Sequence, residues 1–130
     1  MASINVDTTA LEEALARLSE TLDRRMSEAA EDVAVTIADY AKDHHDYIDR
    51  TGFLTASIAP GKVTGTFSKG TLSVNVQAGG KGVTYARYIE EGTARIRPRR
   101  FLAGAIEATE DEQAERFGAA LEAALKESGF

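Results

Sequence analysis

The feature that most constrains this chain is its first third, where residues 8–50 contain neither glycine nor proline. Apolar residues recur there at steps of three and four, the spacing that places side chains on one face of an α-helix. The stretch from Ser27 to Glu31 is weakly apolar, and a bend in the helix is expected there if the helix bends at all. The pattern predicts one helix from about Thr9 to about Asp46. Its apolar stripe consists of Leu11, Leu15, Leu18, Leu22, Met26, Ala29, Val33, Ile37 and Tyr40.

The expected length of this helix raises a packing problem. At a rise of ~1.5 Å per residue it would be about 55 Å long. A compact domain of 130 residues is narrower than that. Two arrangements remain open: the helix packs on its own sheet along its whole length, or its exposed end packs on neighbouring subunits.

The middle of the chain changes from a helical pattern to an alternating one. Thr51-Gly52 is predicted to end the first helix, with Gly52 at positive φ, and Leu54 and Ile58 to cover the sheet. Apolar and polar residues then alternate with period two in residues 62–67 and 71–78, which predicts a hairpin with its turn at Ser68-Lys69-Gly70.

The last part of the chain is expected to be mainly helical. Residues 84–91 predict a short helix that Gly92 ends, and residues 93–100 a basic extended loop. A last helix should run from Phe101 to about Lys126, with Leu102, Ile106, Phe117, Leu121 and Leu125 as its apolar face. The predicted class is α+β: a long N-terminal helix, a small hairpin-based antiparallel sheet, a short helix and a C-terminal helix.

Length favours a single domain, residues 1–130. At its ends we expect an arm or a short strand in residues 1–8 and a flexible tail in residues 127–130.

Charge is distributed in three blocks. Residues 1–50 carry a net charge of −7, residues 51–105 carry +6 and residues 106–130 carry −5, within a total of −6. Opposed potentials favour self-association with a defined orientation. A protein whose main function is to bind duplex DNA should have a positive net charge, and the net charge of this chain is negative.

Composition leaves little material for catalysis or cofactors. There is no cysteine, which suits assembly in a reducing cytoplasm, and His44 and His45 are the only histidines. The acidic residues around them (Asp39, Asp43, Asp46 and Asp49) are interpreted as a solvated helix end and not as a metal site. We expect no enzyme, no cofactor and no membrane segment.

Three short motifs in a fixed order carry a resemblance to a known family. Residues 51–58 read TGFLTASI, residues 85–93 read YARYIEEGT, and residues 97–106 read RPRRFLAGAI. In this order and spacing they resemble the phage tail-component family of head–tail joining, neck and minor tail completion proteins of long-tailed phages. The resemblance covers residues 51–106.

The resemblance implies a structural virion protein that forms a ring at the neck or upper tail end. It implies six-fold symmetry in the particle and contacts with adjacent neck, connector or tail-tube proteins. A basic nucleic-acid-binding module and a small regulatory dimer remain alternative functions.

The last two motifs supply the candidate interface residues. Glu90 and Glu91 should lie within reach of the arginine loop, which could pair with them in its own chain, pair with a neighbouring subunit or approach DNA. The candidate interface comprises Tyr85, Tyr88, Glu90, Glu91, Arg95, Arg97, Arg99 and Arg100. Gly52, Leu54, Ile58, Gly92, Phe101 and Leu102 are expected to be structural.

Overall fold

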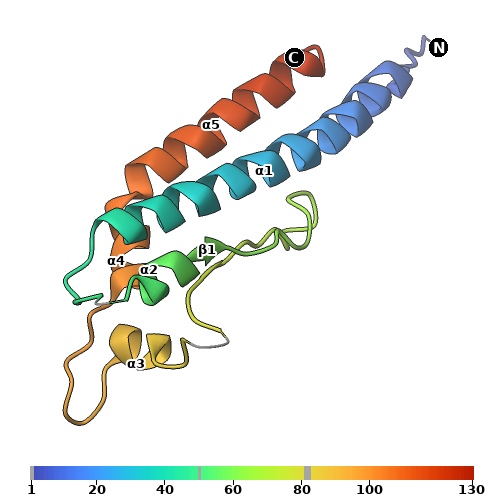
Figure 1. The fold of residues 1–130 in the computed structure, drawn as a ribbon. Coiled ribbons are helices and arrows are strands. Elements are labelled where there is room, and N and C mark those ends of the chain that lie inside the picture. Colours follow the sequence, from blue (N-terminus) through green and yellow to red (C-terminus); the bar gives the residue numbers. More distant parts are fainter. Residues whose placement is uncertain (1, 50, 81–82) are drawn as a thin grey trace.

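The computed structural model describes residues 2–49, 51–80 and 83–130. It confirms the α+β class, with two antiparallel helices on one side and a hairpin and short helices on the other (Figure 1). The elements are α1 (Thr9–Asp43), α2 (Phe53–Ser57), β1 (Ala59–Pro60), β2 (Val76–Gln77), α3 (Ala86–Glu91), α4 (Phe101–Ala108) and α5 (Glu110–Glu127). None of the helices in the described part of the chain is both long and apolar enough to cross a membrane.

The long first helix is present and unbroken, but it ends at Asp43 and not at Asp46. His44 still donates its backbone N–H to the Tyr40 carbonyl at 2.8 Å, and its ring stacks on the Tyr40 ring at 4.0 Å. The chain then leaves the helical path so that Tyr47, 7% exposed, can enter the core. Tertiary burial of one aromatic ring therefore decides where the helix stops.

The expectation that Gly52 ends the first helix is wrong, although its φ is 77° as predicted. Gly52 instead precedes α2, and Asp49 organises this turn. The Asp49 carboxylate accepts the backbone N–H of Gly52 at 2.9 Å and that of Thr55 at 2.8 Å. Such a side-chain cap stabilises a short helix that could not form alone.

The hairpin is longer and less regular than predicted. Its ladder pairs Ala59 with Gln77 and Pro60 with Val76, so the paired strands lie nearer the hairpin base than expected. Only a single bridge, Thr64 to Ser73, forms within the predicted segments. The turn at 68–70 is present, and Leu72, Val74 and Val76 alternate with exposed polar residues as predicted.

The expected single last helix is two helices, α4 and α5, separated by Thr109. Thr109 has φ −106° and ψ 12°, is 4% exposed, and donates its hydroxyl to the Ala105 carbonyl at 2.8 Å. A threonine hydroxyl that bonds four residues back competes with the helix ladder and favours a break. The break lets α4 cover the core while α5 turns to run antiparallel beside α1 (Figure 1).

The buried face of α4 differs by one residue from the predicted face. Phe101 and Ala105 are 3% and 1% exposed, whereas Ile106 is 45% exposed and Leu102 is partly buried. Leu121 in α5 is also 41% exposed. Two small alanines, Ala105 and Ala124, are among the most buried residues of these helices, at 1% and 0% exposed.

The end of α5 is tied to the middle of α1. Glu127 pairs with Arg24 at 2.7 Å and also with Arg25. Residues 127–130, expected as a flexible tail, close the helix in a Schellman motif. In this motif Gly129 has φ 85°, and the Phe130 N–H donates to the Leu125 carbonyl at 2.9 Å.

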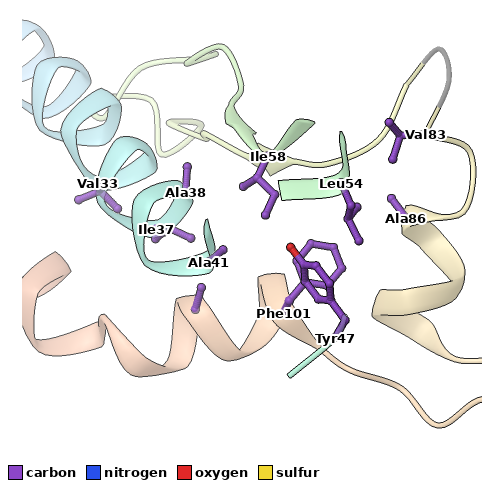
Figure 2. Packing of buried hydrophobic residues seen from close by; sticks show 11 residues of the cluster. Val33, Ile37, Ala38, Ala41, Tyr47, Leu54, Ile58, Val83, Ala86 and Phe101 are labelled. Atoms are coloured by element: carbon purple, nitrogen blue, oxygen red, sulfur yellow. The ribbon is translucent and has the colours of Figure 1, made fainter. Parts of the chain in front are cut away.

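The core lies beside the second half of α1, between it, α2 and α4 (Figure 2). Leu54 and Ile58 are its largest fully buried side chains, at 2% and 0% exposed. The Tyr47 ring meets the Phe101 ring edge-on at 5.2 Å, and its hydroxyl lies 3.0 Å from that of Thr55. Aromatic pairs of this geometry add specificity to burial.

Candidate interaction surface

The short helix α3 presents its two tyrosines outward. Tyr85 is the residue before the helix and is 40% exposed, and Tyr88 is 55% exposed. Ala86 faces the core, and Ile89 packs against it from the side. The isoleucine therefore anchors the helix, and the two tyrosines of the candidate interface remain available for contact.

Gly92 ends α3 as predicted. It has φ 77° and donates its N–H to the Tyr88 carbonyl at 2.8 Å. A Cβ at this position would lie 2.7 Å from the Pro98 nitrogen and 2.8 Å from the Ile96 oxygen. Only glycine satisfies both the positive φ and this close approach of the returning loop.

The basic loop is held in a defined turn. Thr93 donates its N–H to the Ile96 carbonyl at 2.8 Å, and its hydroxyl accepts the N–H groups of Arg95 and Ile96. Farther along, Arg99 donates its N–H to the Ile89 carbonyl at 2.8 Å. The loop projects beyond α3 and away from the two long helices (Figure 1).

Glu90 and Glu91 do not pair with the loop arginines of their own chain, so the intrachain alternative is wrong for these two glutamates. Glu90 instead accepts the backbone N–H groups of Leu102 at 2.9 Å and Ala103 at 3.0 Å. These are unpaired donors in the first turn of α4, where a negative charge is favourable. Glu91 pairs with Arg87 one turn earlier in α3, at 2.9 Å, which raises the pKa of Arg87.

Three of the four loop arginines find other carboxylates. Arg97 and Arg99 both approach Asp46, at 3.0 and 3.5 Å, because residues two apart in an extended chain point the same way. Arg100 approaches Glu107 at 2.6 Å. Arg95 is exposed, and no carboxylate of the described residues lies within ion-pair distance of it.

Arg100 also has an unusual backbone. Its φ of 45° makes it the only residue other than glycine with positive φ in the described part of the chain. It immediately precedes α4, and its carbonyl accepts the Gly104 N–H at 2.7 Å. A left-handed conformation is uncommon for a side chain of this size and persists only where neighbouring contacts hold it.

The acidic residues that follow α1 have structural roles. Asp46 binds two arginines, and Asp49 caps α2. Hydrogen bonds from Thr55, first its side chain and then its backbone, and from the Gly52 N–H lower the pKa of Asp49. Within the described residues, no group of three or more acidic or histidine side chains is arranged to hold a metal ion.

A second exposed surface lies outside the candidate interface residues, although its leucines belong to the predicted stripe of the first helix. The first part of α1 extends past the end of α5, and Leu11 and Leu15 are 53% and 49% exposed there (Figure 1). Residues 2–8 form an irregular arm, in which Ile4 and Val6 are 92% and 80% exposed. The expected helix length was the signal for this surface.

Comparison with known protein families places this fold in a class. Residues 9–92 match a family of phage tail components, the HK97-gp10-like family, described as "Bacteriophage HK97-gp10, putative tail-component". The match spans α1 through Gly92 and covers more than half of the chain. Searches of curated proteins and of solved structures returned no significant match.

The chain belongs to the HK97-gp10-like family and is therefore a structural component of a phage tail, with its place in the virion. Its partners are other structural proteins of the phage. The arginine loop, α4 and α5 lie outside the matched residues, so the match to the family rests on α1, α2, the hairpin and α3. The first of the three motifs lies within the matched residues, the second does so up to Gly92, and the third lies outside them.

Proposed function

We propose that this chain is a ring-forming subunit at the head–tail junction or at the upper end of the tail of a long-tailed phage. In this role it joins or completes the tail and contacts adjacent neck, connector or tail-tube proteins. The ring has six-fold symmetry, and residues 1–130 act as one domain. Subunits assemble in the host cytoplasm before they enter the virion.

The observation that supports a ring best is the unpartnered first part of α1. Leucines at four-residue spacing are about half exposed in a helix that already has a buried face farther along. Full burial of one leucine contributes roughly 1.5–3 kcal/mol. Covering this stripe with a neighbouring subunit would therefore favour assembly.

The charge distribution supports a head-to-tail arrangement. A closed ring needs two different surfaces on each subunit that complement one another. The middle block carries +6 and the last block −5. Arg95, at the projecting loop, is available for a carboxylate of another molecule.

Native mass spectrometry and electron microscopy of the chain, alone and with its neighbouring neck or tail-tube protein, test the proposal. We expect monomers or a broad distribution alone and closed rings with the partner. A Leu11→Gln, Leu15→Gln variant should keep its melting temperature but lose the rings. Leu121→Gln is a matched control, because Leu121 is similarly exposed (41%) and helical but lies in α5, outside this stripe. A tight dimer that does not depend on concentration would contradict the ring.

A further inference from the structure

A shallow groove runs between the second half of α1 and the first strand of the hairpin. It encloses about 450 Å³ and is lined by Glu31 and Val35 from α1 and by residues 60–63 from the hairpin. Val35 is 46% exposed within it, although it lies in the half of α1 that packs beside the core. The described residues therefore leave this apolar side chain only partly covered.

The hairpin side of this groove also has a free edge. Gly61 and Thr64 donate their backbone N–H groups to the second strand, at 2.7 and 2.8 Å. Lys62 and Val63, between them, make no backbone hydrogen bond with the described residues. Unpaired backbone groups along a strand edge are a template for another extended segment.

The arm formed by residues 2–8 has the complementary properties. It is irregular, and Ile4 and Val6 are 92% and 80% exposed. In an extended segment, residues two apart point to the same side. Both apolar side chains could therefore face Val35 and Val63, while Ser3 and Asn5 face solvent.

The arm cannot reach the groove of its own chain. Val35 lies 26 residues beyond Thr9 in an unbroken helix, a distance of about 39 Å along the axis. Ile4 lies five residues before Thr9, so it can be at most about 18 Å from the start of the helix. An arm that binds in this groove must therefore belong to another molecule.

We propose that the arm of one copy of this chain binds in the groove of the next copy, as a short added strand along residues 61–63 with Ile4 and Val6 directed to Val35. The inference rests on the proposed ring, because it supplies a contact between successive subunits. An arm that reaches forward into a distinct groove is a head-to-tail contact, which can propagate around a ring.

The absence of native cysteines makes a crosslinking test direct. The variants Val6→Cys with Val35→Cys, and Ile4→Cys with Val35→Cys, cover the two registers of the arm. A disulfide requires Cα atoms within about 7 Å, so either bond can form only between molecules. Val6→Cys with Ile48→Cys is the matched control, because Ile48 is 85% exposed but lies outside the groove.

On mild oxidation, at least one groove variant should give a ladder of dimers, trimers and larger species. The control should lack this ladder, and a synthetic peptide of residues 2–8 added in excess should suppress it. If neither groove variant yields more crosslinked product than the control, the arm contact is wrong.

The crosslinking result is separable from the proposed function. Closed rings of the wild-type chain seen by electron microscopy, without the crosslink, would overturn the arm contact and leave the ring standing. Crosslinked dimers without any larger species would support the arm contact and overturn the ring.

Discussion

Glu90 and Leu102 are linked by a hydrogen bond of 2.9 Å from the leucine N–H to the glutamate carboxylate, across twelve residues of sequence. The bond fixes the start of α4 against the end of α3. The basic loop between the two helices is therefore closed at its base by a capping interaction, while three of its four arginines pair with carboxylates elsewhere.

Replacing Glu90 with alanine should destabilise the chain by about 1 kcal/mol, within the usual range of roughly 0.5–2 kcal/mol for a lost helix cap. Thermal unfolding measures this change. Glu91→Ala is the control, because its pair with Arg87 is exposed to solvent and should contribute little to stability. Equal effects from the two variants would contradict the capping role.

Gly92→Ala should cost more than Gly70→Ala, although both glycines have similar positive φ values of 77° and 69°. A Cβ at Gly92 would clash with Pro98 and Ile96, whereas a Cβ at Gly70 has nothing within 4 Å. Backbone strain alone costs on the order of 1–3 kcal/mol. Denaturant unfolding of the two variants isolates the steric part, and a smaller loss at Gly92 would refute the close approach.

Acid should destabilise the chain partly through Asp49. Hydrogen bonds from Thr55 and Gly52 lower its pKa in the folded state below the ordinary value of about 3.9. Its contribution is therefore fully present above the unfolded pKa and is lost as the pH falls through the folded pKa. Asp49→Asn should be less stable at pH 7 and lose less additional stability below pH 4. An unchanged pH profile would exclude this carboxylate as a source of acid sensitivity.

Replacing Arg97, Arg99 and Arg100 with alanine should change folding stability little, because each arginine is paired near the surface and such pairs contribute roughly 0–1 kcal/mol. The same variant tests the nucleic-acid alternative. If the loop bound DNA, each lost phosphate contact would reduce the salt slope by about one. We expect negligible DNA affinity in both proteins by fluorescence anisotropy. Strong, salt-dependent binding by the wild type would favour the alternative.

The local parts of the fold could be predicted because their signals lie within a few residues. The stripe from Leu11 to Tyr40 indicated α1, and the alternation of Leu72, Val74 and Val76 indicated the hairpin. Gly92 was identified as a helix end because no other residue adopts its φ as readily.

The parts that were predicted wrongly depend on tertiary contacts, or on single hydrogen bonds that the hydrophobic pattern does not reveal. Asp46 meets Arg97 across 51 residues, so sequence proximity pointed instead to Glu90 and Glu91 as arginine partners. The break at Thr109 depends on one hydroxyl bond inside an otherwise continuous helical pattern. The stripe of large residues predicted the wrong face of α4, because close packing against α1 selected Ala105 over Ile106.

Three successive residues of α1 attach it to the hairpin and to the end of α5. Asp23 binds Ser68 at the hairpin tip through two hydrogen bonds of 2.7 Å, while Arg24 and Arg25 hold Glu127. Residues 9–22, the part of α1 before these contacts, extend for about 21 Å. A force on the free end of this segment acts as a torque on the contacts of Asp23, Arg24 and Arg25. The contacts of Arg24 and Arg25 are ion pairs, which salt weakens. Higher ionic strength should therefore loosen the attachment of α1 to the end of α5 while the core stays unchanged.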